Sequence, residues 1–508
     1  MTRPRLAVAL ALLVLAVLIV TARLHTYGEP LEDDVMVYAV IAHELHAGRA
    51  LYADAWDHKP PGVHVTYWIA EALFGYGRDA VFALVLAAAL ATLGGVYLAG
   101  AALGGRAAGL WAATCWAIAS GDLWLQANQP NTEVFVNACL AWAFALLVAA
   151  RGDSRAARYL TIGALIAWAS LYKQVVVAPA LFLVLAHVVR PPEGRSRARA
   201  AGDVALIAAV GLAAWAAVFS YFTAVGRLAE FYEAVFAYNR YYGRRMPTFV
   251  LRAFDLPRLV VDPYLQVLVP LAALTLVGAL AGWSWRPRRP WTLLAALVLA
   301  TPIAVGMHGQ FVPHYFQLWL PPLTIGAGWA VAALGARFGD RLRWAPAVAG
   351  GATLVVLLAH TLPSYGLPAD DWSVIKYGPI FVEERTVARR IDALLLPGET
   401  FYEWGSEVGL FFESRRRPPT AFSVWPVVDG PAARRLGARV RADLDRDPPE
   451  IFVVAKWTQV YIQGRHPVLD FLAANYRPLR DQDPQSAFLL FARRGGALEQ
   501  RLAVASAR

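Results

Sequence analysis

Long apolar runs recur through the first three quarters of the chain, and shorter polar stretches separate them. Each run approaches the roughly 20 residues that an α-helix needs to span a bilayer. The predicted membrane helices cover residues 6–22, 80–103, 107–120, 133–150, 159–171, 175–189, 202–225, 263–284, 291–306, 315–335 and 345–362. The runs at 159–171 and 175–189 are short, so they could also be half-length helices or one bent span. We therefore expect a polytopic α-helical membrane protein with about eleven crossings.

The composition agrees with a membrane protein and changes how the net charge is interpreted. The mean hydropathy is +0.44 and only 17% of the residues are charged, against about 25% in soluble domains. A net charge of +10 would raise nucleic acid as a partner of a soluble chain. Here the arginines lie in short loops between apolar runs, where they orient membrane helices. We therefore expect membrane lipid, and no nucleic acid, as a partner.

The arginine-bearing loops predict which side of the membrane each loop occupies. They lie at residues 3–5, 106, 151–158, 190–199, 286–289 and 337–343. Placing all of them in the cytoplasm satisfies the positive-inside rule. The N-terminus is then cytoplasmic, and everything after residue 362 lies on the periplasmic side of the inner (plasma) membrane. The first apolar run is interpreted as an uncleaved helix, because no convincing signal-peptide cleavage site follows it.

Residues 363–508 differ in composition from the membrane part at 1–362. Charged residues, Pro and Gly become more frequent, and the apolar runs shorten to strand length. The predicted elements are helices at 380–396, 406–413, 431–445 and 466–475 and strands at 400–404, 450–455 and 486–493. Alternating helices and strands are typical of an α/β domain. We therefore expect a small soluble α/β domain on the periplasmic side.

The loop between the first two membrane helices is rich in ionisable residues. Apolar positions from Val37 to Leu45 recur at helical spacing, which predicts a helix on the membrane surface over residues 34–46. Residues 60–62, Pro-Pro-Gly, are expected to form an extended segment and a turn. The Phe- and Tyr-rich segment 226–262 is interpreted as a second interfacial helix or loop.

Two adjacent carboxylates, Asp33 and Asp34, stand at the start of the predicted surface helix. Acids in a first helical turn gain from the helix dipole, which is a sufficient structural explanation. A carboxylate at a membrane surface is also suited to act as a general base that deprotonates a hydroxyl or an amine. From these residues alone, the structural and the catalytic interpretations are about equally supported.

Lys59 is the first lysine of the chain, and two prolines follow it directly. Proline stiffens the backbone, which restricts the reach of the ammonium group, and lysine is a competent phosphate ligand. It could equally be a lysine that extends to the lipid headgroups. Asp57 and His58 beside it could bind a divalent metal or a sugar hydroxyl, or form an ordinary surface pair.

Further polar groups fall on the same predicted side of the membrane. Glu133 lies in the first turn of a predicted helix that Thr132 or Asn131 can cap, and the cap and the helix dipole would explain it. Lys173 lies between two short helices, and an ionisable residue at membrane depth is a candidate functional residue. His314, which precedes Tyr315, could be a metal ligand, a substrate contact or a cap of the next helix.

The first outer loop resembles that of the GT-C glycosyltransferases. The resemblance rests on Asp34, Tyr38, Ala42, Gly48, Tyr52 and the run Asp-His-Lys-Pro-Pro-Gly at 57–62. More narrowly, the chain resembles their bacterial branch (family 39-like) related to protein O-mannosyltransferases and to the lipid A aminoarabinose transferase. Later boxes similar to that branch lie at 131–135, 172–174, 313–316, 402–405 and 415–419. The resemblance implies a GT-C membrane bundle with interfacial helices and an outer soluble domain.

The resemblance also implies a function. The implied activity is that of a transferase that moves a sugar from a polyprenyl-phosphate carrier to a glycan, lipid or protein acceptor, with inversion. The family's catalytic aspartate stands four residues before a tyrosine, which favours Asp34 over Asp33. The family lysine that contacts the donor phosphate corresponds to Lys59, and the second acid corresponds to Glu133. Further candidate substrate contacts are Tyr38, Asp57, His58, Lys173, His314 and Tyr315.

Two questions stay open from the sequence. Some relatives carry a glutamate before the lysine as a metal ligand, and His58 takes that position here. Because histidine is itself a good zinc ligand, a divalent cation bound by His58 and His314 is a candidate cofactor. The alternative function is a transporter or flippase of lipid-linked saccharides, which would place ionisable residues at mid-membrane and show two related halves. Acids at helix ends and no visible repeat favour an enzyme, which the resemblance implies to be a hexosyl- or pentosyltransferase.

Overall fold

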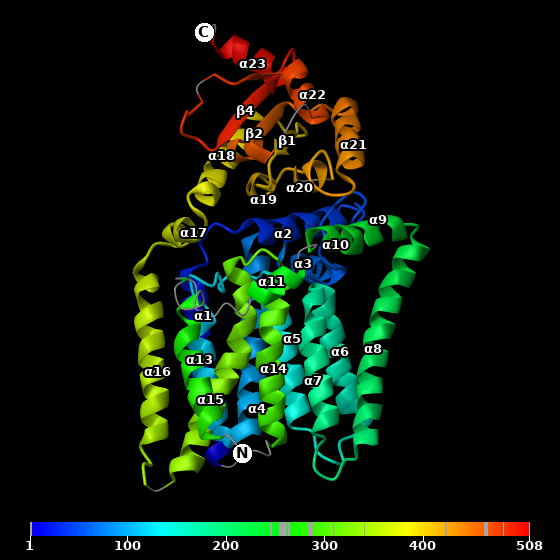
Figure 1. The fold of residues 1–508 in the computed structure, drawn as a ribbon. Helices are drawn as coiled ribbons and strands as arrows, with labels where there is room; N and C mark the ends of the chain where they lie inside the picture. Colours follow the sequence, from blue (N-terminus) through cyan, green and yellow to red (C-terminus); the bar gives the residue numbers. More distant parts are fainter. Residues whose placement is uncertain are drawn as a thin grey trace.

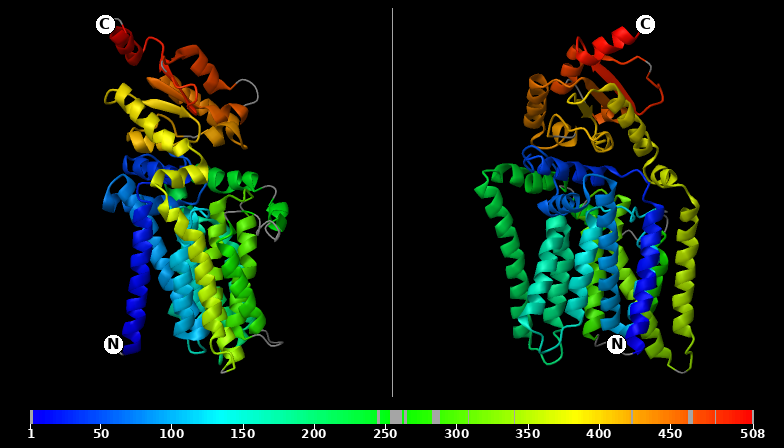
Figure 2. Two further views of the ribbon diagram at one scale, coloured as in Figure 1. Left: turned by 90° about the vertical axis from the view of Figure 1, so that its left-hand side faces the viewer. Right: turned by 180° about the vertical axis from the view of Figure 1, so that it is seen from behind.

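The structure, a computed structural model, describes residues 3–243, 246–252, 262, 265–282, 288–307, 309–339, 341–421, 424–461, 466–480 and 482–506. A bundle of long helices forms one part of the molecule, and a smaller domain with a sheet stands on one end of it (Figure 1). The chain begins at the far end of the bundle and finishes in the small domain, and Figure 2 shows the same division from two other sides. The predicted fold class, a helical membrane bundle with a small α/β domain, is confirmed. The domain boundary at residue 362 stays a prediction.

A helix lies in each range predicted to cross the membrane. The helices of the bundle are α1 (Arg3–His25), α4 (Arg78–Ala119), α5 (Thr132–Val148), α6 (Ala156–Tyr172), α7 (Val177–Val189), α8 (Arg197–Ala224), α13 (Leu268–Ala281), α14 (Arg289–Gly306), α15 (Leu320–Phe338) and α16 (Ala345–Thr361). Short 3₁₀ segments, η1 (Gln174–Val176) and η4 (Pro313–Trp319), precede α7 and α15. In the described part of the chain, six helices are long and apolar enough to cross a membrane, and α5, η1 with α7, and α13 are shorter apolar helices.

The element α4 is a helical hairpin rather than one straight rod. Gly104 and Gly105 leave helical geometry, and Gly105 has a φ of 86°, in the left-handed region that favours glycine. Beyond this turn the indole N–H of Trp116 donates to the carbonyl of Ala89 (3.0 Å). Two residues 27 positions apart would lie about 40 Å apart in a straight helix. The two helices predicted at 80–103 and 107–120 are therefore both present, packed antiparallel.

The short helices α6 and α7 also form a hairpin. Arg195, which follows α7, donates to the carbonyl oxygen of Gly152, which precedes α6 (2.9 Å). The two helices lie side by side in Figure 1. The alternative of one bent span over 159–189 is wrong, because the chain reverses at Lys173, where the backbone is extended between them.

Short helices cover the end of the bundle that faces the small domain. They are α2 (Asp33–His46), α3 (Pro61–Phe74), α9 (Leu228–Tyr232), the π-helical η2 (Glu233–Tyr238), α10 (Asn239–Tyr242) and α11 (Met246–Arg252). The surface helix predicted at 34–46 is present as α2, which lies across the bundle in Figure 1. Part of the segment predicted as interfacial at 226–262 lies outside the described residues.

The expectation that residues 60–62 form an extended segment and a turn is wrong for Pro61 and Gly62, because α3 begins at Pro61. Pro61 occupies the first helical turn, where its fixed φ suits a helix and its missing N–H is no loss. Gly62 then allows close packing, since a Cβ at that position would lie 2.6 Å from the carbonyl oxygen of Leu171. The Pro-Pro-Gly run therefore starts a helix against the end of α6.

The small domain follows α16. Its elements are η5 (Leu362–Gly366), α17 (Ala369–Tyr377), α18 (Ile380–Leu394), β1 (Phe401–Trp404), α19 (Gly409–Ser414), α20 (Val424–Val428), α21 (Ala433–Arg446), β2 (Ile451–Ala455), η6 (Lys456–Tyr461), α22 (Pro467–Asn475), β3 (Tyr476–Pro478), β4 (Phe488–Arg493) and α23 (Ala497–Ser506). The sheet has the order β1-β2-β4-β3, with β1 and β2 parallel and the other pairs antiparallel. β1 and β2 are buried along their whole length, Glu403 of β1 included; for β2 the continuous apolar run Ile-Phe-Val-Val-Ala predicts this.

Two ion pairs, of which the second is buried, tie the small domain to α2 and its flanking loop. Both guanidinium contacts of Arg417 reach the carboxylate of Glu44 on α2, at 2.9 Å each. Lys376 of α17 pairs with Glu29 in the loop before α2, and both side chains are 1% exposed. A buried pair holds its partners firmly, because separating the two charges leaves each one without compensation.

A second contact between α2 and the small domain is a cluster of acidic side chains. Asp33 of α2 meets Glu384, Glu403 and Glu407, and neither carboxylate oxygen of Glu384 has a hydrogen-bond partner among the described residues. Burial, and after it the charge of Glu407, raises the pKa of Asp33 well above its ordinary value. Burial and the neighbouring acids likewise raise the pKa of Glu384 and of Glu403. The cluster therefore holds protons at a pH where ordinary carboxyls have lost them.

This cluster makes the stability of the protein depend on pH. A carboxyl whose pKa is raised by folding resists ionisation, so the folded state loses stability as the pH rises from the ordinary pKa through the raised one. We expect the melting temperature of the purified protein to increase as the pH is lowered from about 8 to about 5. Glu384→Gln should raise the melting temperature at the higher pH and flatten this dependence. Glu193→Gln, at an exposed position, is the control; an unchanged slope in Glu384→Gln would contradict the prediction.

Candidate functional site

A cavity of about 640 Å³ lies between the small domain and the end of the bundle that faces it. This volume falls within the range of about 300–1,000 Å³ that is usual for ligand sites. Acids and bases of the first outer loop, aromatic residues after α9 and two residues of the small domain line it. The lining residues are Glu32, Asp33, Asp34, Val37, Trp56, Asp57, His58, Lys59, Tyr238, Tyr241, Tyr242, Gln310, Val312, His314, Tyr315, Ser406 and Asp429.

Asp34 and Lys59 lie next to each other in the lining of this cavity. The ammonium nitrogen of Lys59 lies 3.7 Å from a carboxylate oxygen of Asp34. Burial alone would raise the pKa of Asp34, but the charge of Lys59 outweighs it and leaves this pKa below its ordinary value. Burial would lower the pKa of Lys59, yet Asp34 and Asp57 raise it above its ordinary value. The pair is therefore fully charged at neutral pH.

The adjacent residues Asp33 and Asp34 have different surroundings. Successive residues of a helix point about 100° apart, so only one of them can face Lys59. Asp34 does so, whereas Asp33 accepts a hydrogen bond from the backbone N–H of Val408 and meets the acids of the small domain. The structure thus separates the two candidates that the sequence left side by side.

The backbone around Lys59 is held by neighbouring side chains. The Tyr52 hydroxyl donates to the carbonyl of Lys59 (2.8 Å), and Tyr52 itself has a φ of 68°. A tyrosine in the left-handed region is uncommon, and such strain concentrates at functional sites. His58 lies 3.2 Å from the Lys59 ammonium through Nε2 and 3.2 Å from the Asp57 carboxylate through Nδ1. Burial would raise the pKa of Asp57, but Lys59 and hydrogen bonds from the histidines hold it well below its usual range.

Asn131 connects two acids of the cavity, a role that sequence reasoning missed. Its side-chain N–H₂ donates to Glu32 (2.6 Å) and to Asp34 (3.3 Å), while its carbonyl oxygen caps α5 at the N–H of Thr132 (2.7 Å). The predicted site residue Tyr38 also donates to this oxygen (3.3 Å). The one signal in the sequence was the predicted cap, since a local pattern does not show which distant side chains share it.

Glu32 differs from Asp34 in its protonation. It is 7% exposed, and burial, with the charges of Asp34 and Glu133, raises the pKa of Glu32 to about 8. At neutral pH Glu32 is therefore mostly protonated, and Asp34 is the ionised member of the pair that Asn131 connects. A single charged oxygen acceptor next to a lysine is the arrangement expected of a general base beside an anion site.

Glu133 and Lys173 lie beneath the cavity and do not line it. Glu133 is 0% exposed, accepts from the Thr132 hydroxyl (3.0 Å) and forms an ion pair with Lys173. The ammonium of Lys173 lies 4.1 Å from the centre of the Tyr315 ring. This pair can hold Tyr315, which does line the cavity. The role of Glu133 as a second catalytic acid stays a prediction.

His314 reaches the cavity from η4. Its Nδ1 lies 3.2 Å from Oε1 of Gln126, and its Nε2 has no hydrogen-bond partner among the described residues. Gln126 has a φ of 55°, another uncommon conformation beside the site. A buried ring nitrogen left without a partner is available to a ligand.

The described residues do not fit a metal ion. No group of three or more His, Cys, Asp or Glu side chains in the described ranges is arranged to hold one. The two predicted ligands have other neighbours, since His58 contacts Lys59 and Asp57 and His314 contacts Gln126. A cation between Asp34 and His58 would have to displace the ammonium of Lys59. We therefore derive no step through a metal.

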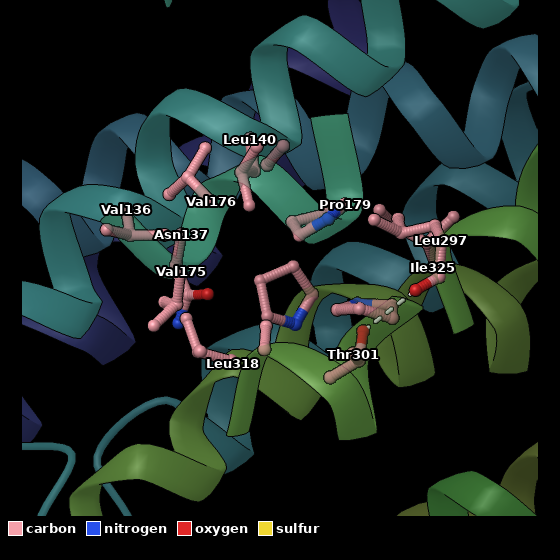
Figure 3. A pocket seen from close by; sticks show the side chains of 14 residues that line it. Val136, Asn137, Leu140, Val175, Val176, Pro179, Leu297, Thr301, Leu318 and Ile325 are labelled. Carbon is pink, nitrogen blue, oxygen red and sulfur yellow. Dashed lines mark hydrogen bonds between the residues drawn. The ribbon is translucent and has the colours of Figure 1, made fainter. Parts of the chain in front are cut away.

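Within the membrane part, a second pocket has a different character (Figure 3). It has a volume of about 20 Å³ and lies among Val136, Leu140, Val175, Leu297 and other apolar residues. Its polar side chains are engaged, because Asn137 donates to the carbonyl of Gln317 (2.9 Å) and Thr301 to that of Leu297 (2.8 Å). This volume has room for about one water molecule, so the pocket is a packing gap and no path for a saccharide.

One family model matches the chain. Residues 58–221, about a third of the sequence, match the family described as dolichyl-phosphate-mannose-protein mannosyltransferase. The match begins at His58, directly before Lys59, and includes Glu133 and Lys173. No curated protein matches the chain by sequence.

Solved structures resemble the fold over nearly its whole length. ArnT from Cupriavidus metallidurans bound to undecaprenyl phosphate is 16% identical, with a TM-score of 0.60, covering 95% of this chain and 97% of that one. The archaeal oligosaccharyltransferase AglB from Archaeoglobus fulgidus, in complex with an inhibitory peptide and a dolichol-phosphate, is 15% identical, with a TM-score of 0.54, covering 97% and 75%. A structure of the A. fulgidus oligosaccharyltransferase with Zn and sulfate is 15% identical, with a TM-score of 0.52, covering 95% and 73%.

These comparisons define a class. The chain has the fold of the GT-C glycosyltransferases, and the resemblance drawn from the first outer loop is confirmed. About a third of the chain matches a mannosyltransferase family model, and the solved structures match its fold.

The buried pair of Glu133 and Lys173 predicts a non-additive effect on stability. Glu133→Gln leaves the Lys173 charge buried without its partner, which typically costs about 3–5 kcal/mol. Lys173→Met should cost a similar amount, because it leaves Glu133 in the same state. The double variant should be more stable than either single variant, as measured by denaturant unfolding of the purified protein. Additive losses would show that the two side chains do not act as a pair.

Proposed function

We propose that this protein is an integral-membrane glycosyltransferase that moves one sugar from a polyprenyl-phosphate carrier to an acceptor at the outer face of the membrane. The observation that carries the proposal is the Asp34–Lys59 pair, which lines a cavity at the outer end of the bundle. A base and a phosphate ligand are the two groups that such a transfer requires. Solved structures with the same fold bind undecaprenyl phosphate or dolichol-phosphate, which supports a carrier of this class.

The proposed reaction is a single displacement at the anomeric carbon. Asp34 takes the proton of the acceptor hydroxyl or amine, the freed electron pair forms the bond to the anomeric carbon, and the bond to the phosphate oxygen breaks. The electron pair of this broken bond leaves with the polyprenyl phosphate, whose negative charge Lys59 stabilises. The attack comes from the side opposite the leaving group, so the configuration inverts. The leaving group is a stabilised anion, so no separate general acid is needed.

Donor binding would also strengthen the base. In the free protein the charge of Lys59 holds the pKa of Asp34 below its ordinary value, against the opposing effect of burial. A donor phosphate beside Lys59 would compensate that charge, so the pKa of Asp34 would rise. The carboxylate then becomes a better proton acceptor when the donor is in place, which couples the base to the presence of its substrate.

The acceptor is proposed to enter from the side of the small domain. Ser406 and Asp429 of that domain line the cavity, and the hydroxyl of Tyr241 donates to Asp429. These contacts support a domain that covers the site and docks a glycan, lipid or protein acceptor. The proposal leaves the transferred group as a hexose or a pentose, and a divalent cation is not part of it.

The sharpest test of this function compares the two adjacent acids. Asp34→Asn keeps the shape of the side chain and removes the base, so single-turnover transfer from a polyprenyl-phosphate sugar should fall by about 10²–10⁴-fold. Asp33→Asn is the matched control, because Asp33 faces the small domain rather than Lys59, and it should be much milder. Equal losses in the two variants would remove Asp34 from its role, and full activity of Asp34→Asn would contradict the mechanism.

The location is proposed as the inner (plasma) membrane, with the N-terminus in the cytoplasm and residues 363–508 outside. The arginine-bearing loops support this orientation, and Figure 1 places the two chain ends at opposite ends of the molecule. A reporter that is active only in the cytoplasm should stay dark when fused after the last residue, Arg508, and active when fused before the first helix. A bright C-terminal fusion would reverse the orientation.

A further inference from the structure

One wall of the cavity is aromatic. Trp56 and Tyr238 meet edge to face with ring centres 5.0 Å apart, and Tyr238 and Tyr242 lie nearly parallel, 6.5 Å apart at 20°. The His58 ring lies 5.6 Å from Tyr238 and 5.8 Å from Tyr242. All four residues line the cavity. We call Trp56, His58, Tyr238 and Tyr242 the aromatic wall.

Two distant segments build this wall, and side-chain contacts hold them in register. Tyr238 ends the π-helix η2 and Tyr242 ends α10, so the two rings are four residues apart on successive turns. Asn239 between them donates to the carbonyl of His58 (2.6 Å). π-Helical turns occur often at functional sites, where they redirect side chains. The wall is thus a positioned surface rather than an accidental contact of mobile rings.

The composition of the cavity around the wall fits a sugar. Sugars combine a face of C–H bonds with a rim of hydroxyl groups, and the electron-rich face of an aromatic ring attracts the positively polarised C–H bonds. The same cavity carries the carboxylates of Asp34 and Asp57 close to the wall, and carboxylates accept hydrogen bonds from hydroxyls. Apolar rings with a few precisely placed polar groups are the usual lining of a small-molecule site.

The position of the wall selects the donor sugar over the acceptor. The ammonium of Lys59, the proposed phosphate ligand, lies 3.2 Å from Nε2 of the His58 ring. The side chain of Tyr242, another ring of the wall, is hydrogen-bonded to that of Tyr315. In the donor only one oxygen separates the phosphorus from the anomeric carbon, so a phosphate at Lys59 places its sugar beside these rings.

We propose that the aromatic wall binds the C–H face of the single sugar carried by the lipid-phosphate donor. The proposal rests on the proposed function and adds the part of the site that recognises the sugar. Lys59 would recognise the phosphate whether or not it carries a sugar, whereas the wall recognises the sugar alone. Bare polyprenyl phosphate, the product, would then leave more readily than the donor.

Binding of two lipids to the full-length protein, without acceptor, separates these roles. The probes are polyprenyl phosphate and the same lipid carrying one hexose or one pentose. Trp56→Leu and Tyr238→Leu should weaken the sugar-bearing lipid by about three- to tenfold, the range of one lost aromatic contact, and change the bare lipid by less than about twofold. Tyr238→Phe keeps the ring and should retain most of the preference. Lys59→Ala should weaken both lipids.

The outcomes of this experiment distinguish a failure of the sugar-binding wall from a failure of the proposed function. The ratio of the two affinities is measured on one preparation, so a variant that folds in part still reports it. If Trp56→Leu and Tyr238→Leu weaken both lipids equally, or neither, the wall does not bind the sugar and the inference falls, while Lys59→Ala still tests the donor. If the unaltered protein binds neither lipid, the proposed function itself is wrong.

Discussion

The ion pair between Asp34 and Lys59 is the interaction on which the rest of the outer face depends. Two opposite charges 3.7 Å apart in a largely buried setting hold each other ionised, and either one alone would tend to lose its charge. Their separation exceeds that of a good hydrogen bond, so the ammonium keeps donors for a further anion. A pair of this kind is stable without substrate and still able to respond to a phosphate.

The helix α2 connects this ion pair to the small domain. Its first turn carries Asp33 toward the acids of the small domain and Asp34 toward Lys59, and Glu44 in its last turns binds Arg417. One surface helix therefore contacts the bundle, the cavity and the small domain at once. Because Lys376 also pairs with Glu29 just before α2, a movement of the small domain would be transmitted to the carboxylate of Asp34.

The contrast between the two pockets explains why transfer suits this molecule better than transport. The pocket inside the bundle is small and mostly apolar, and its polar side chains Asn137 and Thr301 already donate to backbone carbonyls. The large cavity lies at the end of the bundle, where Tyr238, His314 and Asp34 reach it from different elements. Charged chemistry is less costly there, since buried charges at mid-membrane lose their hydration without replacement.

The sequence by itself determined the membrane class, the helix positions, the surface helix α2 and the candidates Asp34 and Lys59. These features are local: helical periodicity, apolar length and a short motif depend on residues close together in the chain. The start of α3 at Pro61 was missed because the residues of a turn also suit a first helical turn. Only the tertiary structure decided that Asn131 bonds to Glu32 and Asp34, which lie 99 and 97 positions before it. It also decided that Asp33 faces away from Lys59 and that Trp56 meets Tyr238. Such contacts depend on how separate helices pack, and no local pattern carries that information.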